Sequence, residues 1–150
     1  MKVYIVRHGE VLHNALKIYN NENEDLNENG VKQAETLKYK IKDLEYDIII
    51  SSPLIRAKHT AEIINFKNKD ILIDNRLEER NPGDLSGKPL GVTNREEYWN
   101  YYTEIQYGTS ENIQEFFKRI YNFLEELKTR NYESVLIVAH SGVSKAFSGY

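Results

Sequence analysis

The stretch Val3-Tyr4-Ile5-Val6-Arg7-His8-Gly9-Glu10, residues 3–10, joins a short apolar run directly to an Arg-His-Gly-Glu sequence. The apolar run is short and rich in β-branched residues, which is typical of a strand covered on both faces of a parallel sheet. Arg7 and His8 then follow the carboxyl end of that strand, where α/β sheets bind ligands. Gly9 allows the backbone to approach a ligand closely. The stretch therefore predicts an α/β fold with a binding site after its first strand.

The rest of the chain alternates short apolar strands with helical patterns. The expected elements are strands at residues 3–6, 47–51, 71–73 and 135–139, and helices at residues 30–44, 53–64 and 111–130. This alternation predicts a three-layer α/β/α sandwich with a mostly parallel central sheet. Ser51 and Ser52 follow the second strand, and His140 follows the last one. We expect these side chains to share one pocket with Arg7 and His8.

Composition limits the partners that this chain can attract. It has 150 residues, a net charge of -3 and no cysteine. Without cysteine, thiolate nucleophiles and cysteine-based metal sites are excluded. A net negative charge gives no long-range attraction to nucleic acid or anionic membranes, so we expect neither as a partner. No apolar run approaches the ~18 residues of a membrane span and no signal peptide is evident, so we expect a cytoplasmic protein.

Arg56 is the second cation that indicates an anion site. It falls in the first turn of the expected helix 53–64, where the helix dipole disfavours a positive charge. An anion held jointly by Arg56 and the helix N-terminus would remove this conflict. A lone histidine at a strand end is more often a hydrogen-bonded structural residue than a nucleophile. Taken singly, His8 and His140 therefore leave both interpretations open.

Taken together, four segments resemble the histidine phosphatase family, also called the phosphoglycerate mutase-like family. They occur in the family's order: Val3 to Glu10; Ser51-Ser52-Pro53-Leu54-Ile55-Arg56-Ala57; Leu77-Glu78-Glu79-Arg80-Asn81-Pro82-Gly83-Asp84-Leu85-Ser86-Gly87; and Val138-Ala139-His140-Ser141-Gly142. The resemblance covers nearly the whole chain. It implies a phosphoglycerate mutase-like fold and a single histidine phosphatase domain over residues 1–150 that lacks the family's C-terminal segment.

The resemblance implies a metal-independent histidine acid phosphatase-type phosphomonoesterase that needs no cofactor and acts on a small phosphorylated metabolite. His8, held in the correct tautomer by a backbone carbonyl, would form a phosphohistidine intermediate. Glu79 would first protonate the leaving group and then activate water. The residues expected to take part in catalysis are His8, Glu79, His140 and Arg7. The residues expected to bind the phosphate are Arg7, Asn14, Arg56 and a protonated His140.

Several features leave alternatives open. Val11 stands where the family usually has Thr or Ser, so one hydroxyl contact to the ligand is lost. Glu78 competes with Glu79 for the role of acid. Residues 98–105 carry aromatic side chains at near-helical spacing, which predicts either an amphipathic helix packed on the core or a lid over the substrate. On the helix that follows, we assign Glu111 and Arg119 a structural role.

Three other functions compete with hydrolysis of a small monoester. The first is phosphoglycerate mutase-type phosphoryl transfer, although the short segment available to cover the site favours hydrolysis. The second is a phosphatase that acts on protein phosphohistidine, but such relatives generally lack the acidic residue found at Glu79. The third is a non-catalytic phosphate-binding module. The oligomeric state is left open.

Overall fold

In a computed structural model, which describes residues 1–150, the four expected strands form a single parallel sheet. The strands are β1 (Lys2–Arg7), β2 (Ile48–Ser51), β3 (Ile71–Ile73) and β4 (Ser134–Ala139). Their order is β1-β4-β2-β3, so the last strand in sequence lies between the first and the second. Lys2 pairs with Ser134 and Ser51 pairs with Val138. This order brings the carboxyl ends of β1, β2 and β4 together.

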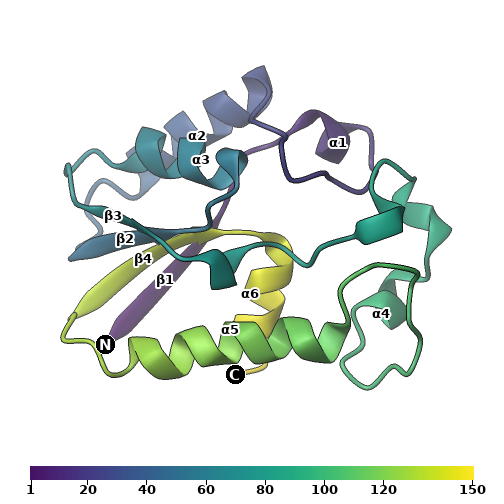
Figure 1. Ribbon diagram of the computed structural model, residues 1–150. Helices are drawn as coiled ribbons and strands as arrows, with labels where there is room; N and C mark the ends of the chain where they lie inside the picture. The colour runs from purple at the N-terminus through teal and green to yellow at the C-terminus, as the bar shows by residue number, and fades with distance from the viewer.

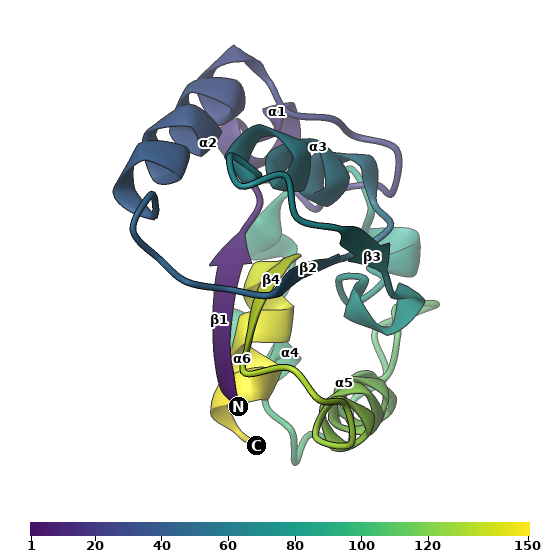
Figure 2. The same cartoon turned by 90° about the vertical axis from the view of Figure 1, so that its left-hand side faces the viewer.

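Helices cover both faces of the sheet, as the α/β/α prediction requires (Figures 1 and 2). The helices are α1 (Leu12–Ala15), α2 (Glu28–Lys40), α3 (Ile55–Ile64), α4 (Arg95–Tyr98), α5 (Ile113–Leu127) and α6 (Ser141–Ser148). One core joins α2 and α3 to Ile49, Leu136 and Val138. The other joins α5 and α6 to Ile50 and Ile137, on the opposite face. The fold prediction is confirmed, and no helix is long and apolar enough to cross a membrane.

Three helices start at other residues than expected, and two of these starts, those of α2 and α5, are set by side-chain caps. Helix α3 begins at Ile55, so Pro53 precedes the helix and does not stand in its first turn as predicted. Asn27 accepts a hydrogen bond from the backbone N–H of Gly30 and starts α2 at Glu28. Asn112 caps α5 in the same way through the N–H of Glu115. Such caps satisfy amide groups that have no partner within the helix.

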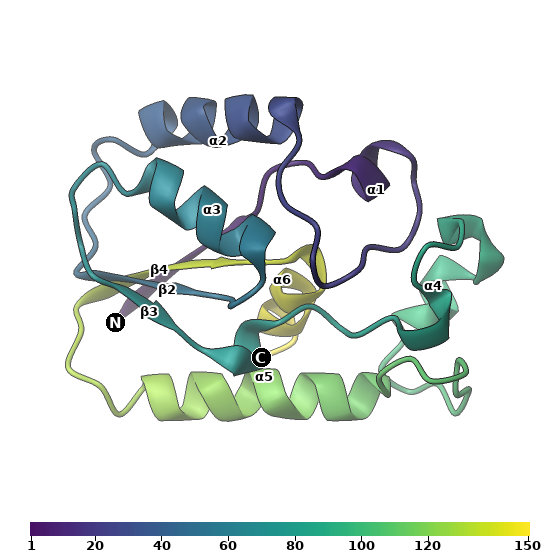
Figure 3. The same cartoon turned by 45° about the horizontal axis from the view of Figure 1, so that its top comes forward.

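Between β3 and α5 the chain forms loops and short helices, which lie outside the α/β/α sandwich and beside the carboxyl ends of the strands (Figure 3). The predicted helix through residues 98–105 is wrong, because α4 ends at Tyr98. Side chains compete there for the backbone: Asn100 accepts the N–H of Tyr102, and Gln114 donates to the carbonyl of Thr103. Tyr98 is buried, whereas Tyr102 is 85% exposed. Only the first part of this aromatic run therefore packs inward.

Candidate active site

A cavity of about 350 Å³ opens at the carboxyl ends of the strands. Five of the residues singled out in the sequence line it: Arg7, His8, Asn14, Arg56 and Glu79. Glu78 and the aromatic pair Tyr98 and Trp99 also line it. Nowhere in the chain do three or more His, Asp or Glu side chains gather so that they could hold a metal ion. The cavity thus collects sequence-distant cations, imidazole and carboxylates in one place.

His8 is buried and oriented by its own backbone. Its Nδ1 lies 2.6 Å from the carbonyl oxygen of Gly9. Because a carbonyl can only accept, Nδ1 carries the proton and Nε2 keeps a lone pair. Burial lowers the pKa of His8 to about 3; the hydrogen bond to Gly9 opposes this shift, while the charges of Arg56 and Arg7 add to it. His8 is therefore a neutral imidazole, the form that can act as a nucleophile.

His140 lies behind His8 and is fully buried. The two ring centroids are 5.1 Å apart, and His140 Nε2 lies 2.9 Å from the hydroxyl oxygen of Ser52. Burial, followed by the proximity of His8 and the charge of Arg56, lowers the pKa of His140 well below its usual value. These surroundings favour a neutral ring, contrary to the expected protonated His140. A protonated ring would need the compensating charge of a bound anion.

Arg56 reaches the cavity from the first turn of α3 and is 2% exposed. Its Nη1 donates to the carbonyl of Asn21 at 2.7 Å, and its buried Nε has no partner within the protein. Burial lowers the pKa of Arg56, and the nearby carboxylates of Glu79 and Glu24 oppose that shift. Arg7 is exposed at the cavity wall and forms no ion pair. Both guanidinium groups keep donors available for an anion.

Glu79 is held at the start of α6 by backbone amides. Its Oε2 accepts the N–H of Gly142 at 3.0 Å, and its Oε1 accepts the N–H of Arg80 at 2.9 Å. A β-carbon on Gly142 would collide with Glu79 Oε1 and with the ring of Trp99, so only glycine fits at this position. The neighbouring Glu78 also lines the cavity, but its carboxylate forms no hydrogen bond and no ion pair. Of the two acidic residues, Glu79 has the fixed position.

Thr60, which was not singled out in the sequence, and Ser52 organise the site. Ser51 and Ser52 were expected to share the pocket, but both are fully buried and neither lines the cavity. Thr60 Oγ1 accepts the N–H of Gly9 at 3.1 Å and donates to the carbonyl of Arg56 at 2.8 Å. It therefore joins the loop that carries His8 to α3. The signal for Thr60 was its spacing of four residues after Arg56, which places both on one helix face. Ser52, which follows β2, makes the hydrogen bond to His140.

Asn14 and Val11 define the turn after β1. Asn14 Oδ1 accepts the N–H of Val11 at 3.1 Å, and its Nδ2 approaches Asn20 Oδ1 at 3.4 Å. Asn14 lines the cavity as expected, whereas the Val11 side chain is fully buried outside the lining. Valine at position 11 therefore contributes to packing in a place where a hydroxyl was expected from the family pattern.

Comparison with known proteins agrees with this geometry. The sequence profile of the histidine phosphatase superfamily (branch 1) matches residues 3–150. The chain belongs to this superfamily. Among similar proteins, the uncharacterized phosphatase PhoE of Bacillus subtilis is 36% identical over 147 residues, which cover 96% of this chain and 74% of PhoE. Phosphoserine phosphatase 1 of Hydrogenobacter thermophilus is 30% identical over 155 residues, covering 94% of this chain and 71% of its own length.

Solved structures of similar chains have the same fold. The alpha-ribazole phosphatase from Shigella flexneri has a TM-score of 0.82 and 29% identity, over 96% of this chain and 76% of that one. Bacillus stearothermophilus YhfR has a TM-score of 0.85 and 25% identity, over 98% and 77% of the two chains. The phosphoglycerate mutase-like fold is thereby confirmed. Several of these relatives are named as phosphatases, which supports phosphatase chemistry for this member of the superfamily.

Proposed function

We propose that the protein is a phosphatase that hydrolyses small phosphate monoesters through a phosphohistidine on His8. The observation that carries the proposal is the state of His8: buried, neutral, with Nδ1 held by Gly9 and Nε2 unprotonated. Arg7 and Arg56 line the same cavity and supply the charge that a phosphate dianion requires. A nucleophile and its anion-binding groups thus converge in one small cavity.

In the first step, His8 Nε2 attacks phosphorus while the bond from phosphorus to the ester oxygen breaks. An alkoxide is a poor leaving group, so Glu79 gives its proton to that oxygen as it departs. Arg7 and Arg56 donate to the equatorial oxygens, where charge accumulates in the transition state. His140 stays an expected phosphate ligand because its buried Nδ1 has no partner within the protein, although the fully buried ring lies behind the cavity wall and does not line it.

In the second step, water attacks the phosphohistidine and Glu79 takes a proton from that water. The bond from phosphorus to Nε2 breaks, which restores neutral His8 and releases inorganic phosphate. The cavity volume of about 350 Å³ fits a small metabolite. Relatives named for phosphoserine and alpha-ribazole provide the starting points for a substrate panel, with O-phosphoserine and a nucleoside-type 5'-phosphate as its first members.

The test follows the phosphoryl group. We would incubate the protein with phosphate-labelled phosphoserine, quench in alkali and look for acid-labile label on His8. Label that is then released from His8 as inorganic phosphate supports the phosphatase. Label that is transferred from His8 to a second organic acceptor would indicate mutase-type transfer instead. Binding without label, unchanged in a His8→Ala variant, would indicate a non-catalytic phosphate-binding module and refute the proposal.

The Glu79→Gln variant should slow alkyl phosphates selectively. Loss of a general acid costs about 10²–10⁴-fold in rate, so kcat/KM for phosphoserine, which reports the step that breaks the ester bond, should fall by this order. Nitrophenyl phosphate should be affected much less, because nitrophenolate leaves with little need for a proton. Steady-state kinetics with both esters measure the difference. Glu78→Gln is the matched control, and a larger selective loss in that variant would assign the acid to Glu78.

A further inference from the structure

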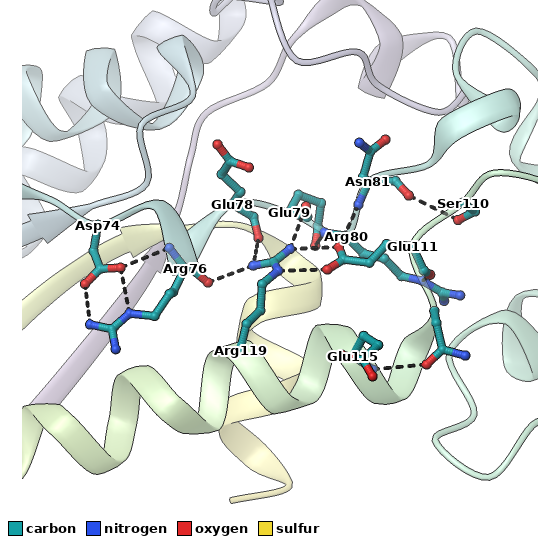
Figure 4. A network of polar contacts seen from close by, with 11 residues as sticks. Asp74, Arg76, Glu78, Glu79, Arg80, Asn81, Ser110, Glu111, Glu115 and Arg119 are labelled. Carbon is teal, nitrogen blue, oxygen red and sulfur yellow. Dashed lines mark hydrogen bonds and ion pairs between the residues drawn. The ribbon is translucent and has the colours of Figure 1, made fainter.

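The guanidinium of Arg119 donates to three backbone carbonyls of residues 76–79, the stretch that carries Glu79 and is called the donor segment below (Figure 4). Arg119 Nη1 donates to the carbonyls of Arg76 and Glu78, each at 2.7 Å, and Nη2 donates to the carbonyl of Glu79 at 3.1 Å. Arg119 lies on the long helix α5, whose apolar face belongs to the core. The donor segment is therefore tied to a helix whose apolar face is packed in the core on that side of the sheet.

Glu111 completes this contact from the residues just before α5. It binds Arg119 with both carboxylate oxygens, through Nε and Nη2, each at 2.9 Å. All five N–H groups of Arg119 are then in use. Glu111 Oε1 also accepts the N–H of Asn81 at 3.1 Å, and the Glu111 carbonyl accepts Arg80 Nε at 2.7 Å. Glu111 and Arg119 together bind residues on both sides of Glu79.

The two ends of Glu79 are thus fixed by different elements. Arg119 holds its carbonyl from α5, and Gly142 of α6 holds its carboxylate. A proton donor works only within hydrogen-bond reach of the leaving oxygen, and a misplacement of about 1 Å can cost about 10²-fold in rate. Lysine at position 119 would keep the positive charge but could not form the planar fork.

We propose that Arg119, supported by Glu111, is the positioning residue for the proton donor Glu79 and thereby sets the efficiency of leaving-group protonation. The inference rests on the proposed function, and it assigns to this pair more than the structural role expected from the sequence. A purely structural role would lower the amount of folded enzyme and slow every substrate equally. A positioning role lowers kcat/KM only for those substrates whose leaving group needs the proton, because hydrolysis of the phosphohistidine comes after that step and is common to all esters.

The experiment compares Arg119→Lys with Arg130→Lys, a matched change near the end of α5. Arg130 pairs with Glu126 and has no contact with the donor segment. For Arg119→Lys, we expect kcat/KM for phosphoserine to fall by about 10-fold or more and kcat/KM for nitrophenyl phosphate by less than about 2-fold. Arg130→Lys should match the wild type with both esters. Equal slowing of both esters by Arg119→Lys would overturn the inference.

A double-mutant cycle tests whether Arg119 acts through Glu79. In a Glu79→Gln background, Arg119→Lys should cause no further loss with phosphoserine, because the donor is already absent. A full additional loss in that background would overturn the inference. If Arg119→Lys fails to fold, Glu111→Gln weakens the same bidentate contact and should show the same ester selectivity. Wild-type protein that turns over no phosphate monoester would refute the proposed function itself, which separates the two failures.

Discussion

Replacement of His8 by alanine should lower turnover of every phosphate monoester by about 10⁴-fold or more. No second unprotonated imidazole lines the cavity, since His140 lies behind His8 and is fully buried. Both activated and unactivated esters should lose turnover, because each requires the same nucleophile. Initial rates with phosphoserine and nitrophenyl phosphate measure the loss.

Matched controls make this result specific to the nucleophile. His59 lies on α3 and pairs with Asp25 outside the cavity lining, so His59→Ala should retain turnover. Inorganic phosphate should still bind the His8→Ala variant, because Arg7 and Arg56 remain. The expected loss for His8→Ala is about 10⁴-fold. If the rate of this variant stayed within about 10-fold of the wild type, another group would have to attack phosphorus.

Acidification below about pH 6.5 should destabilise the protein. The pKa of His8 is about 3 in the folded protein, against 6.5 in an unfolded chain. Below pH 6.5 the unfolded state takes up a proton that the folded state does not, so stability is full above pH 6.5 and declines as the pH falls. By pH 5, His8 alone should cost about 2 kcal/mol of unfolding free energy. His140, whose pKa is lowered in the same direction, adds to this loss.

Urea unfolding at pH 7 and pH 5 measures this dependence, and His8→Ala provides the reference that lacks the titrating group. The wild type should lose more stability than the variant over this interval. Inorganic phosphate should reduce the loss, because its charge favours protonated imidazole in the folded state. The same pH dependence in both proteins would contradict the assignment of the buried neutral state to His8.

The sequence allowed the layers of the fold and most of the site to be predicted, because both depend on local patterns. Short apolar runs define the strands, and polar residues directly after β1, β2 and β4 mark the end of the sheet where a site forms. Arg56 was predictable from the conflict between its charge and its place in the first helical turn. These inferences need only periodicity and the parallel arrangement of the strands.

Other features depend on contacts between distant residues, which no local pattern specifies. The protonation state of His140 follows from complete burial beside His8 and Arg56. The end of α4 at Tyr98 depends on hydrogen bonds from Asn100 and Gln114, which outweigh the helical spacing of the aromatic residues. The contacts of Arg119 with the donor segment join residues about 40 positions apart.

The central place of β4 has a consequence for how the enzyme acquires activity as it is made. The loop carrying His8 and the helix carrying Arg56 follow β1 and β2, which do not pair with each other and are joined through β4, although β2 also pairs with β3. Closing such long loops is slow compared with forming local helices. During synthesis the sheet cannot close until residues 134–139 have left the ribosome. A nascent chain shorter than this should contain helices but no phosphate-binding site, so binding should arise in one late, cooperative event.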